Sequence, residues 1–174
     1  MLHRDIKPAN LLLDEHGTVL VTDFGLAKAL QAAQDLTHSG DITGTLRYMA
    51  PEQFQGKTDP RSDVYSLGLT LYELLTLQPA FRESDRSALM RRISEGAAPR
   101  PRKLNPHVPR DLETIVLKAI ACDPAHRYPS AGALAEDLQR FTEDRPILAR
   151  RTSSLERAWR WSRRNPAIAG LGGL

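Results

Sequence analysis

Apolar residues recur along this 174-residue chain with two different periods, and the change of period predicts where strands give way to helices. Two short apolar runs, Leu11 to Leu13 and Thr18 to Val21, flank the turn Glu15-His16-Gly17 and predict a β-hairpin near the amino end. From Asp63 onward, apolar residues recur three and four positions apart, as on one face of an α-helix. The pattern predicts a small sheet followed by helices, an α+β fold that is mostly α.

Four segments carry the helical spacing. The most apolar runs from Asp63 to Thr76, and its nearly uncharged interior predicts a buried helix whose first residue, Asp63, accepts backbone N–H groups. A second segment extends from Ser84 to Glu95, and a third begins at Asp111 and carries the clearest amphipathic pattern. The last is capped by Ser130.

Two stretches lack any period. Residues 26–48 gather Gln, Thr, Ser, Gly and Asp, a composition typical of a mobile loop. Residues 97–109 are rich in Pro and Arg and predict an extended surface loop. The cations in that loop either attract an acidic partner or are simply solvated; they are Arg100, Arg102 and Lys103.

Polar residues on both sides of the predicted hairpin have the types that phosphoryl transfer requires. The stretch HRDIKPAN places Asp5, Lys7 and Asn10 within six residues, and Asp23 follows the second strand. Carboxylate and amide oxygens suit Mg²⁺, a carboxylate can orient a hydroxyl, and a Lys can offset phosphate charge. The residues therefore indicate a transfer site that holds Mg²⁺, with Mn²⁺ as a substitute.

These stretches resemble the protein kinase family. HRDIKPAN, then Asp23-Phe24-Gly25, then Ala50-Pro51-Glu52 are similar to the family's catalytic loop, metal-binding loop and the end of its activation segment. The resemblance runs from residue 2 to about residue 142. It implies the C-terminal lobe of the kinase fold, in which the hairpin carries the catalytic and metal-binding loops. No G-x-G-x-x-G occurs, so we expect the N-lobe to be absent and Met1 to be an internal start.

The resemblance assigns chemical roles to single residues. Asp5 becomes the catalytic base, Lys7 contacts the transferred phosphate, and Asn10 and Asp23 hold the Mg²⁺ of bound ATP. Thr45 is expected to hydrogen-bond near Asp5 and Lys7. Five more residues receive structural roles, with Asp63 holding the catalytic-loop backbone and Arg127 pairing with Glu52; the set is His3, Arg4, Glu52, Asp63 and Arg127.

The non-periodic stretch 26–48 corresponds to the activation segment of that family. Thr37, Ser39 and Thr43 are candidate phosphosites, because a phosphate dianion there could pair with Arg4 and order the loop. The alternative is that these are solvated hydroxyl groups.

The same resemblance indicates the acceptor. Lys7 with Pro8, and Gly44 with Thr45, are similar to the serine/threonine branch, so ATP would phosphorylate Ser or Thr of protein substrates, self-phosphorylation and dimerisation included. Dual specificity stays open. The alternative function is a catalytically silent, kinase-like binding or scaffold module.

Composition and charge narrow the class of protein. The chain is 41% hydrophobic and 26% charged, as ordinary globular proteins are. A single cysteine, Cys122, excludes an internal disulfide and fits the cytoplasm. Residues 1–149 carry 18 Lys and Arg against 20 Asp and Glu, whereas residues 150–174 carry six against one. The basic charge therefore belongs to the tail, and nucleic-acid binding is not expected.

The tail predicts a membrane edge. Six arginines surround Trp159 and Trp161, and an apolar run starts at Pro166, a sequence typical of the cytoplasmic side of a transmembrane helix. We therefore divide the chain into a kinase-like lobe (1–142), a basic juxtamembrane segment (143–165) and the start of a membrane helix (166–174). The protein is then expected at the cytoplasmic face of the plasma membrane; a basic tail or surface helix is the alternative.

Overall fold

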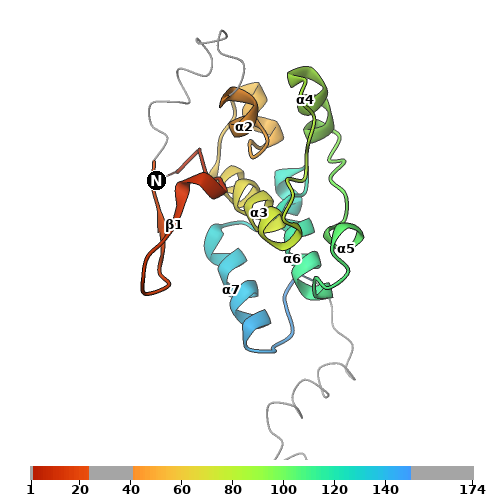
Figure 1. Ribbon diagram of the computed structural model, residues 1–174. Helices are drawn as coiled ribbons and strands as arrows, with labels where there is room; N and C mark the ends of the chain where they lie inside the picture. Colours follow the sequence, from red (N-terminus) through yellow and green to blue (C-terminus); the bar gives the residue numbers. More distant parts are fainter. Residues whose placement is uncertain (1, 24–40, 150–174) are drawn as a thin grey trace, which may run out of the picture.

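The computed structural model describes residues 2–23 and 41–149, which form a mostly helical structure with one two-stranded antiparallel sheet (Figure 1). In chain order the elements are η1 (Pro8–Asn10), β1 (Leu11–Leu13), β2 (Val19–Val21), α2 (Asp41–Leu46), η2 (Pro51–Gln55), α3 (Pro60–Thr76), α4 (Arg86–Ser94), α5 (Pro101–Leu104), α6 (Arg110–Ala119), η3 (Pro124–His126) and α7 (Ala131–Thr142). Helix α3 runs through the middle, with the hairpin on one side and α6 and α7 below it in this view.

The hairpin forms where the two apolar runs predict it. Leu11 pairs with Val21 and Leu13 with Val19. Gly17 supplies the left-handed turn residue, with φ of +79°. The Asp14 carboxylate accepts hydrogen bonds from the backbone N–H groups of His16 and Thr18 and thereby closes the turn. The local sequence alone thus determines this element.

Helix α3 begins three residues earlier than predicted. Asp59 is the N-cap, accepting from the Arg61 N–H at 2.7 Å, and Pro60 occupies the first helical position, which suits its fixed φ. The prediction that Asp63 starts the helix was therefore wrong, although its carboxylate does accept backbone N–H groups. The helix ends at Thr76, as predicted.

Two hydrophobic clusters form the core around α3. The upper cluster joins α3 to α4, α6 and the segment before η2; its buried members are Leu46, Ala50, Tyr65, Leu69, Tyr72, Phe81, Leu89, Ile93, Val116 and Ile120. The lower cluster joins α3 to α6, α7 and the segment after α7; its buried members are Val64, Ile115, Ala119, Tyr128, Leu134 and Ile147. Gly68 allows the close approach of α3 to α6, because a Cβ there would lie 2.7 Å from that of Ala119.

The remaining predicted helices are present with shifted ends. Helix α4 starts after its N-cap Asp85 and α6 starts at Arg110, each within two residues of prediction. Ser130 caps α7 by accepting from the Ala133 N–H at 3.2 Å, as predicted. Helix boundaries depend on single capping contacts, so shifts of this size are expected.

Both predicted loops contain a short helix, which corrects the prediction. Asp41–Leu46 is helical within the stretch predicted as mobile, and residues 24–40 of that stretch lie outside the described residues. Pro101–Leu104 is helical within the stretch predicted as extended. There, Glu113 accepts from the Arg102 N–H at 3.0 Å, and Asn105 donates to the Leu75 carbonyl at 2.9 Å. Long-range contacts therefore stabilise a turn that the composition did not indicate.

Candidate active site

The backbone before Asp5 is held by α3. One Asp63 carboxylate oxygen accepts from the His3 N–H at 2.8 Å and the other from the Arg4 N–H at 2.9 Å. Arg4 has φ of +66°, in the left-handed region that non-glycine residues rarely adopt. Such a conformation persists only where the surroundings impose it, and the two bonds to Asp63 do so here. Asp63 thus has the structural contact that the resemblance implied.

The His3 side chain links the catalytic loop to the end of the hairpin. Its Nδ1 accepts from the Asp5 N–H at 3.4 Å, and Nε2 lies 3.0 Å from the Thr22 carbonyl oxygen, as a donating N–H would. Thr22 also donates its own N–H to the Asn10 carbonyl at 2.9 Å. The sequence analysis did not identify Thr22. The only sign of its role in the sequence is that a polar residue directly follows an apolar strand. Through it, the loop and the start of the Asp23 segment form one hydrogen-bonded unit.

Asp5, Lys7, Asn10 and Thr45 meet in a single cluster. Asp5 is buried, and its Oδ2 lies 3.2 Å from Lys7 Nζ and accepts from Asn10 Nδ2 at 3.1 Å. Asn10 Nδ2 also donates to the Asp5 carbonyl at 2.8 Å. Lys7 Nζ donates to Thr45 Oγ1 at 2.9 Å across 38 residues of sequence. The predicted hydrogen bonding of Thr45 is therefore confirmed for Lys7.

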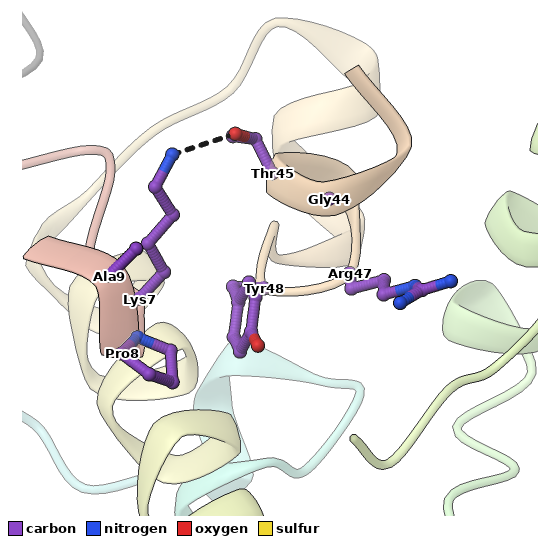
Figure 2. Close-up of a pocket in the computed structure, with 7 residues that line it drawn as sticks. All are labelled: Lys7, Pro8, Ala9, Gly44, Thr45, Arg47 and Tyr48. Carbon is purple, nitrogen blue, oxygen red and sulfur yellow. Dashed lines mark hydrogen bonds between the residues drawn. The ribbon is translucent and has the colours of Figure 1, made fainter. Parts of the chain in front are cut away.

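A hollow of about 270 Å³ adjoins this cluster (Figure 2). Its lining comes from η1 and from α2 with the residues after it; the lining residues are Lys7, Pro8, Ala9, Gly44, Thr45, Arg47 and Tyr48. Figure 2 shows Lys7 reaching up to Thr45, whereas Arg47 extends away from both. The hollow therefore lies beside Lys7, whose ammonium group is 3.2 Å from Asp5 Oδ2, and its lining carries two cationic side chains, those of Lys7 and Arg47.

Tyr48, which sequence reasoning did not single out, is fixed in the wall of this hollow. Its hydroxyl donates to Glu73 Oε2 at 2.5 Å, and its carbonyl accepts from the Ser66 hydroxyl at 2.8 Å. Burial, and then the hydrogen bond and the charge of Glu73, raise the pKa of Tyr48 well above its usual range. The phenol therefore keeps its proton to a higher pH than an ordinary tyrosine does, which favours its hydrogen bond to Glu73.

Asp23 stands exposed at the end of the hairpin with φ of +56°. Its neighbour Thr22 is bonded to Asn10, so the two predicted metal ligands belong to one connected element. Asn10 uses its amide nitrogen for Asp5, which leaves Oδ1 for a cation. Within residues 2–23 and 41–149, no three His, Cys, Asp or Glu side chains gather as a metal site. Two protein oxygens nonetheless fit Mg²⁺, which binds few protein ligands together with substrate phosphates.

Glu52 and Arg127 form the expected pair at the base of the segment that carries Thr45. Arg127 donates from Nη1 to Glu52 Oε1 at 2.7 Å and from Nη2 to Oε2 at 2.8 Å, and its side chain has no exposed area. Ser62 adds a third hydrogen bond to Oε1 at 2.7 Å. Burial opposes ionisation of Glu52, but these bonds, led by those from Arg127, together hold its pKa below its usual value. The pair joins η2, which follows the segment of Thr45, to the residue directly after η3.

The other predictions stay open. Thr37 and Ser39 lie outside the described residues, and of Thr43 only its place in α2 is described. Arg4 is exposed, as a partner for phosphate would need to be. Residues 150–174 also lie outside the described residues, so the membrane edge stays a prediction. Among the helices that the structure does describe, none is long and apolar enough to cross a bilayer.

Comparison with known proteins places the chain in a family. Residues 1–138 match the protein kinase domain. The chain is 44% identical over 146 residues to the tyrosine-protein kinase MasK of Myxococcus xanthus, covering 83% of this chain and 22% of that protein. It is 40% identical over 147 residues to the serine/threonine-protein kinase PrkC of Bacillus subtilis, covering 83% and 22%.

A third relative is the serine/threonine-protein kinase PknB of Mycobacterium tuberculosis, 39% identical over 149 residues that cover 84% of this chain and 24% of that protein. The chain thus spans less than a quarter of the length of these curated relatives. With the catalytic-loop geometry described above, these matches show that the chain belongs to the protein kinase family and is homologous to bacterial serine/threonine protein kinases over about 83% of its length.

Proposed function

We propose that this chain carries the phosphoryl-transfer site of an ATP-dependent protein serine/threonine kinase. The observation that carries the proposal is the hydrogen bonding of the Asp5 carboxylate. Lys7 and Asn10 both engage its Oδ2, whereas Oδ1 has no hydrogen-bond donor among the described residues. A fixed carboxylate with one oxygen available can accept the hydrogen of an acceptor hydroxyl and orient that oxygen toward a phosphate.

Lys7 adds charge stabilisation next to this base. Its ammonium group is held between Asp5 and Thr45 and is only 15% exposed, so its position is set before any substrate arrives. A preorganised cation in a partly desolvated site offsets negative charge that develops on a transferring phosphoryl group. Lys7 therefore serves as the electrostatic partner of the phosphate, and Thr45 keeps it in place.

Asn10 Oδ1 and the Asp23 carboxylate are the groups that would hold Mg²⁺ of bound ATP. When bound, Mg²⁺ neutralises charge on the phosphate oxygens. The chain contributes the spacing of the two ligands, because the Thr22 N–H is bonded to the Asn10 carbonyl at 2.9 Å. No Gly-rich phosphate loop occurs in the sequence, so we expect the 174-residue chain alone to bind ATP weakly and not to turn over.

The acceptor is proposed to be Ser or Thr on a protein. The hollow beside Lys7 offers an extended peptide a place next to Asp5, and two of the relatives named above are serine/threonine-protein kinases. The name of MasK specifies tyrosine instead, so the acceptor residue needs a direct assay. Phosphoamino-acid analysis of labelled products separates Ser, Thr and Tyr.

The test is transfer of radiolabelled γ-phosphate from ATP to a protein acceptor by the intact gene product. Asp5→Asn keeps the shape of the side chain but removes the base, and we expect transfer to fall by at least about 100-fold. His16→Ala, at the exposed tip of the hairpin, is the matched control and should retain full transfer. Partner binding without transfer by the wild type would establish the scaffold alternative instead.

A further inference from the structure

The segment Pro146–Ala149, here called the C-terminal strap, lies beyond the part of the chain that matches the kinase domain, which ends at residue 138. It is nevertheless packed as core. Ile147 is 2% exposed and belongs to the lower hydrophobic cluster, whereas the neighbouring Leu148 is 59% exposed. One side chain of the strap is therefore inserted into the domain, and the next one faces solvent.

A fully buried carboxylate, that of Asp137 in α7, holds the strap. Asp137 Oδ1 accepts from the Leu148 N–H at 2.5 Å, and Oδ2 accepts from the Ala149 N–H at 2.8 Å and from the Tyr128 hydroxyl at 2.8 Å. A carboxylate buried this deeply is unfavourable unless such donors compensate it. The strap supplies two of the three hydrogen bonds, so Asp137 and the strap depend on each other.

The cluster that receives Ile147 contains the neighbours of both side chains that anchor the active site. Val64 follows Asp63, which holds the His3 and Arg4 N–H groups, and both Val64 and Ile147 are in this cluster. Tyr128, which is bonded to Asp137, follows Arg127, which holds Glu52. Close-packed interiors transmit displacement, so an unseated strap would disturb both anchors.

We propose that the C-terminal strap is a positioning element of the active site. Asp137 and Ile147 seat it, and the seated strap keeps Asp63 and Arg127 where they hold the catalytic loop and the segment of Thr45. The carboxyl-terminal side of the domain is thereby coupled to the site. The expected effect on kcat rests on the proposed function. The coupling between the strap and the catalytic loop does not, because amide exchange measures it without any activity.

The first measurement is amide hydrogen exchange of the 174-residue chain. The variants are Ile147→Val, which removes one buried carbon and leaves the fold intact, and Asp137→Asn; Leu148→Ala is the matched control on the exposed side. We expect exchange of the His3 and Arg4 N–H groups to accelerate about fivefold beyond that of α3 core amides in both variants, and not in the control. The proposal would be overturned if the His3 and Arg4 amides accelerated no more than the α3 core amides do, or did not accelerate at all.

The second measurement is steady-state kinetics of the intact gene product with the same variants. We expect kcat to fall about fivefold with little change in KM for ATP, since the strap acts on the geometry of Asp5 and not on nucleotide contacts. A rise in KM with kcat unchanged contradicts the positioning role. An inactive wild type refutes the proposed function, whereas the exchange experiment still decides the role of the strap.

Discussion

Arg127 donates all five of its guanidinium N–H groups. Two reach Glu52 at 2.7 and 2.8 Å, and the others reach the carbonyls of Arg61, Ala121 and Cys122 at 2.7 to 3.0 Å. The guanidinium also lies 4.7 Å from the centre of the Tyr65 ring. Only a planar fork with five donors satisfies this set, so the position requires Arg and not merely a positive charge.

We therefore predict that Arg127→Lys destabilises the chain by about 2–4 kcal/mol, because Lys leaves the buried Glu52 carboxylate and several carbonyls without donors. Arg86→Lys is the control, since Arg86 is exposed at the start of α4 and its replacement should change stability by less than about 0.5 kcal/mol. Urea denaturation of both variants measures the difference. Similar losses in the two would mean that the fork around Glu52 contributes nothing special.

The lowered pKa of Glu52 predicts a dependence of stability on acid. Because the folded pKa lies below the ordinary value of 4.5, the contribution of Glu52 is complete above that pH and is lost as the pH falls through the folded pKa. The stability gap between wild type and Glu52→Gln should therefore narrow as the pH is lowered from 5 to 3. The pKa of Asp59 is also lowered, through its hydrogen bonds to Arg61, but Asp59 is present in both proteins, so its contribution cancels in the difference between their stabilities. A constant gap would refute the linkage.

Gly68 should tolerate no side chain. A Cβ there would lie 2.7 Å from Ala119 Cβ and 2.8 Å from Ile120 Cγ2, so Gly68→Ala is expected to cost about 1–3 kcal/mol by forcing α3 and α6 apart. Gly132→Ala in α7 is the matched control, because its Cβ would meet nothing nearer than Ser130 Oγ at 3.7 Å. That substitution should leave the free energy of unfolding unchanged or raise it by at most about 1 kcal/mol. Thermal denaturation of both variants checks that Gly68→Ala lowers the melting temperature and that Gly132→Ala does not.

Asp63→Asn should loosen the catalytic loop selectively. The amide presents an NH₂ group to one of the two N–H groups that the carboxylate now accepts, and we expect a loss of about 1–3 kcal/mol together with faster amide exchange at His3 and Arg4. Asp85→Asn is the control, since Asn caps a helix as well as Asp does. Unchanged exchange at His3 and Arg4 in Asp63→Asn would show that the loop is held by other contacts.

Much of the fold follows from local sequence. The hairpin forms from its two apolar runs and a turn made by Asp14 and Gly17, and the period and first residues of α6 and α7 indicate these helices, so all of these elements were predicted within a few residues. Helices α2 and α5 were missed because each is six residues or fewer. A helix that short is stabilised by its neighbours, here by Glu113 accepting from Arg102 N–H, and not by its own sequence.

The residues of the candidate site likewise fall into those that the sequence indicated and those that only the structure revealed. The resemblance named Asp5, Lys7 and Asn10, whose spacing along the chain already brings them together. It did not reveal Thr22 or Tyr48, since neither residue type indicates chemistry by itself. Their importance appears only when the bonds from Thr22 to His3 and Asn10, and from Tyr48 to Glu73, are known.

By itself, the sequence indicated which residues are candidates for the chemistry and determined where most helices and the hairpin form, because side-chain type and short-range periodicity are properties of neighbouring residues. Only the tertiary structure decided what holds that chemistry in place. Asp63 reaches Arg4 across 59 residues and Arg127 reaches Glu52 across 75. Contacts of that length depend on how α3 packs against its neighbours in three dimensions, and no local pattern encodes the packing.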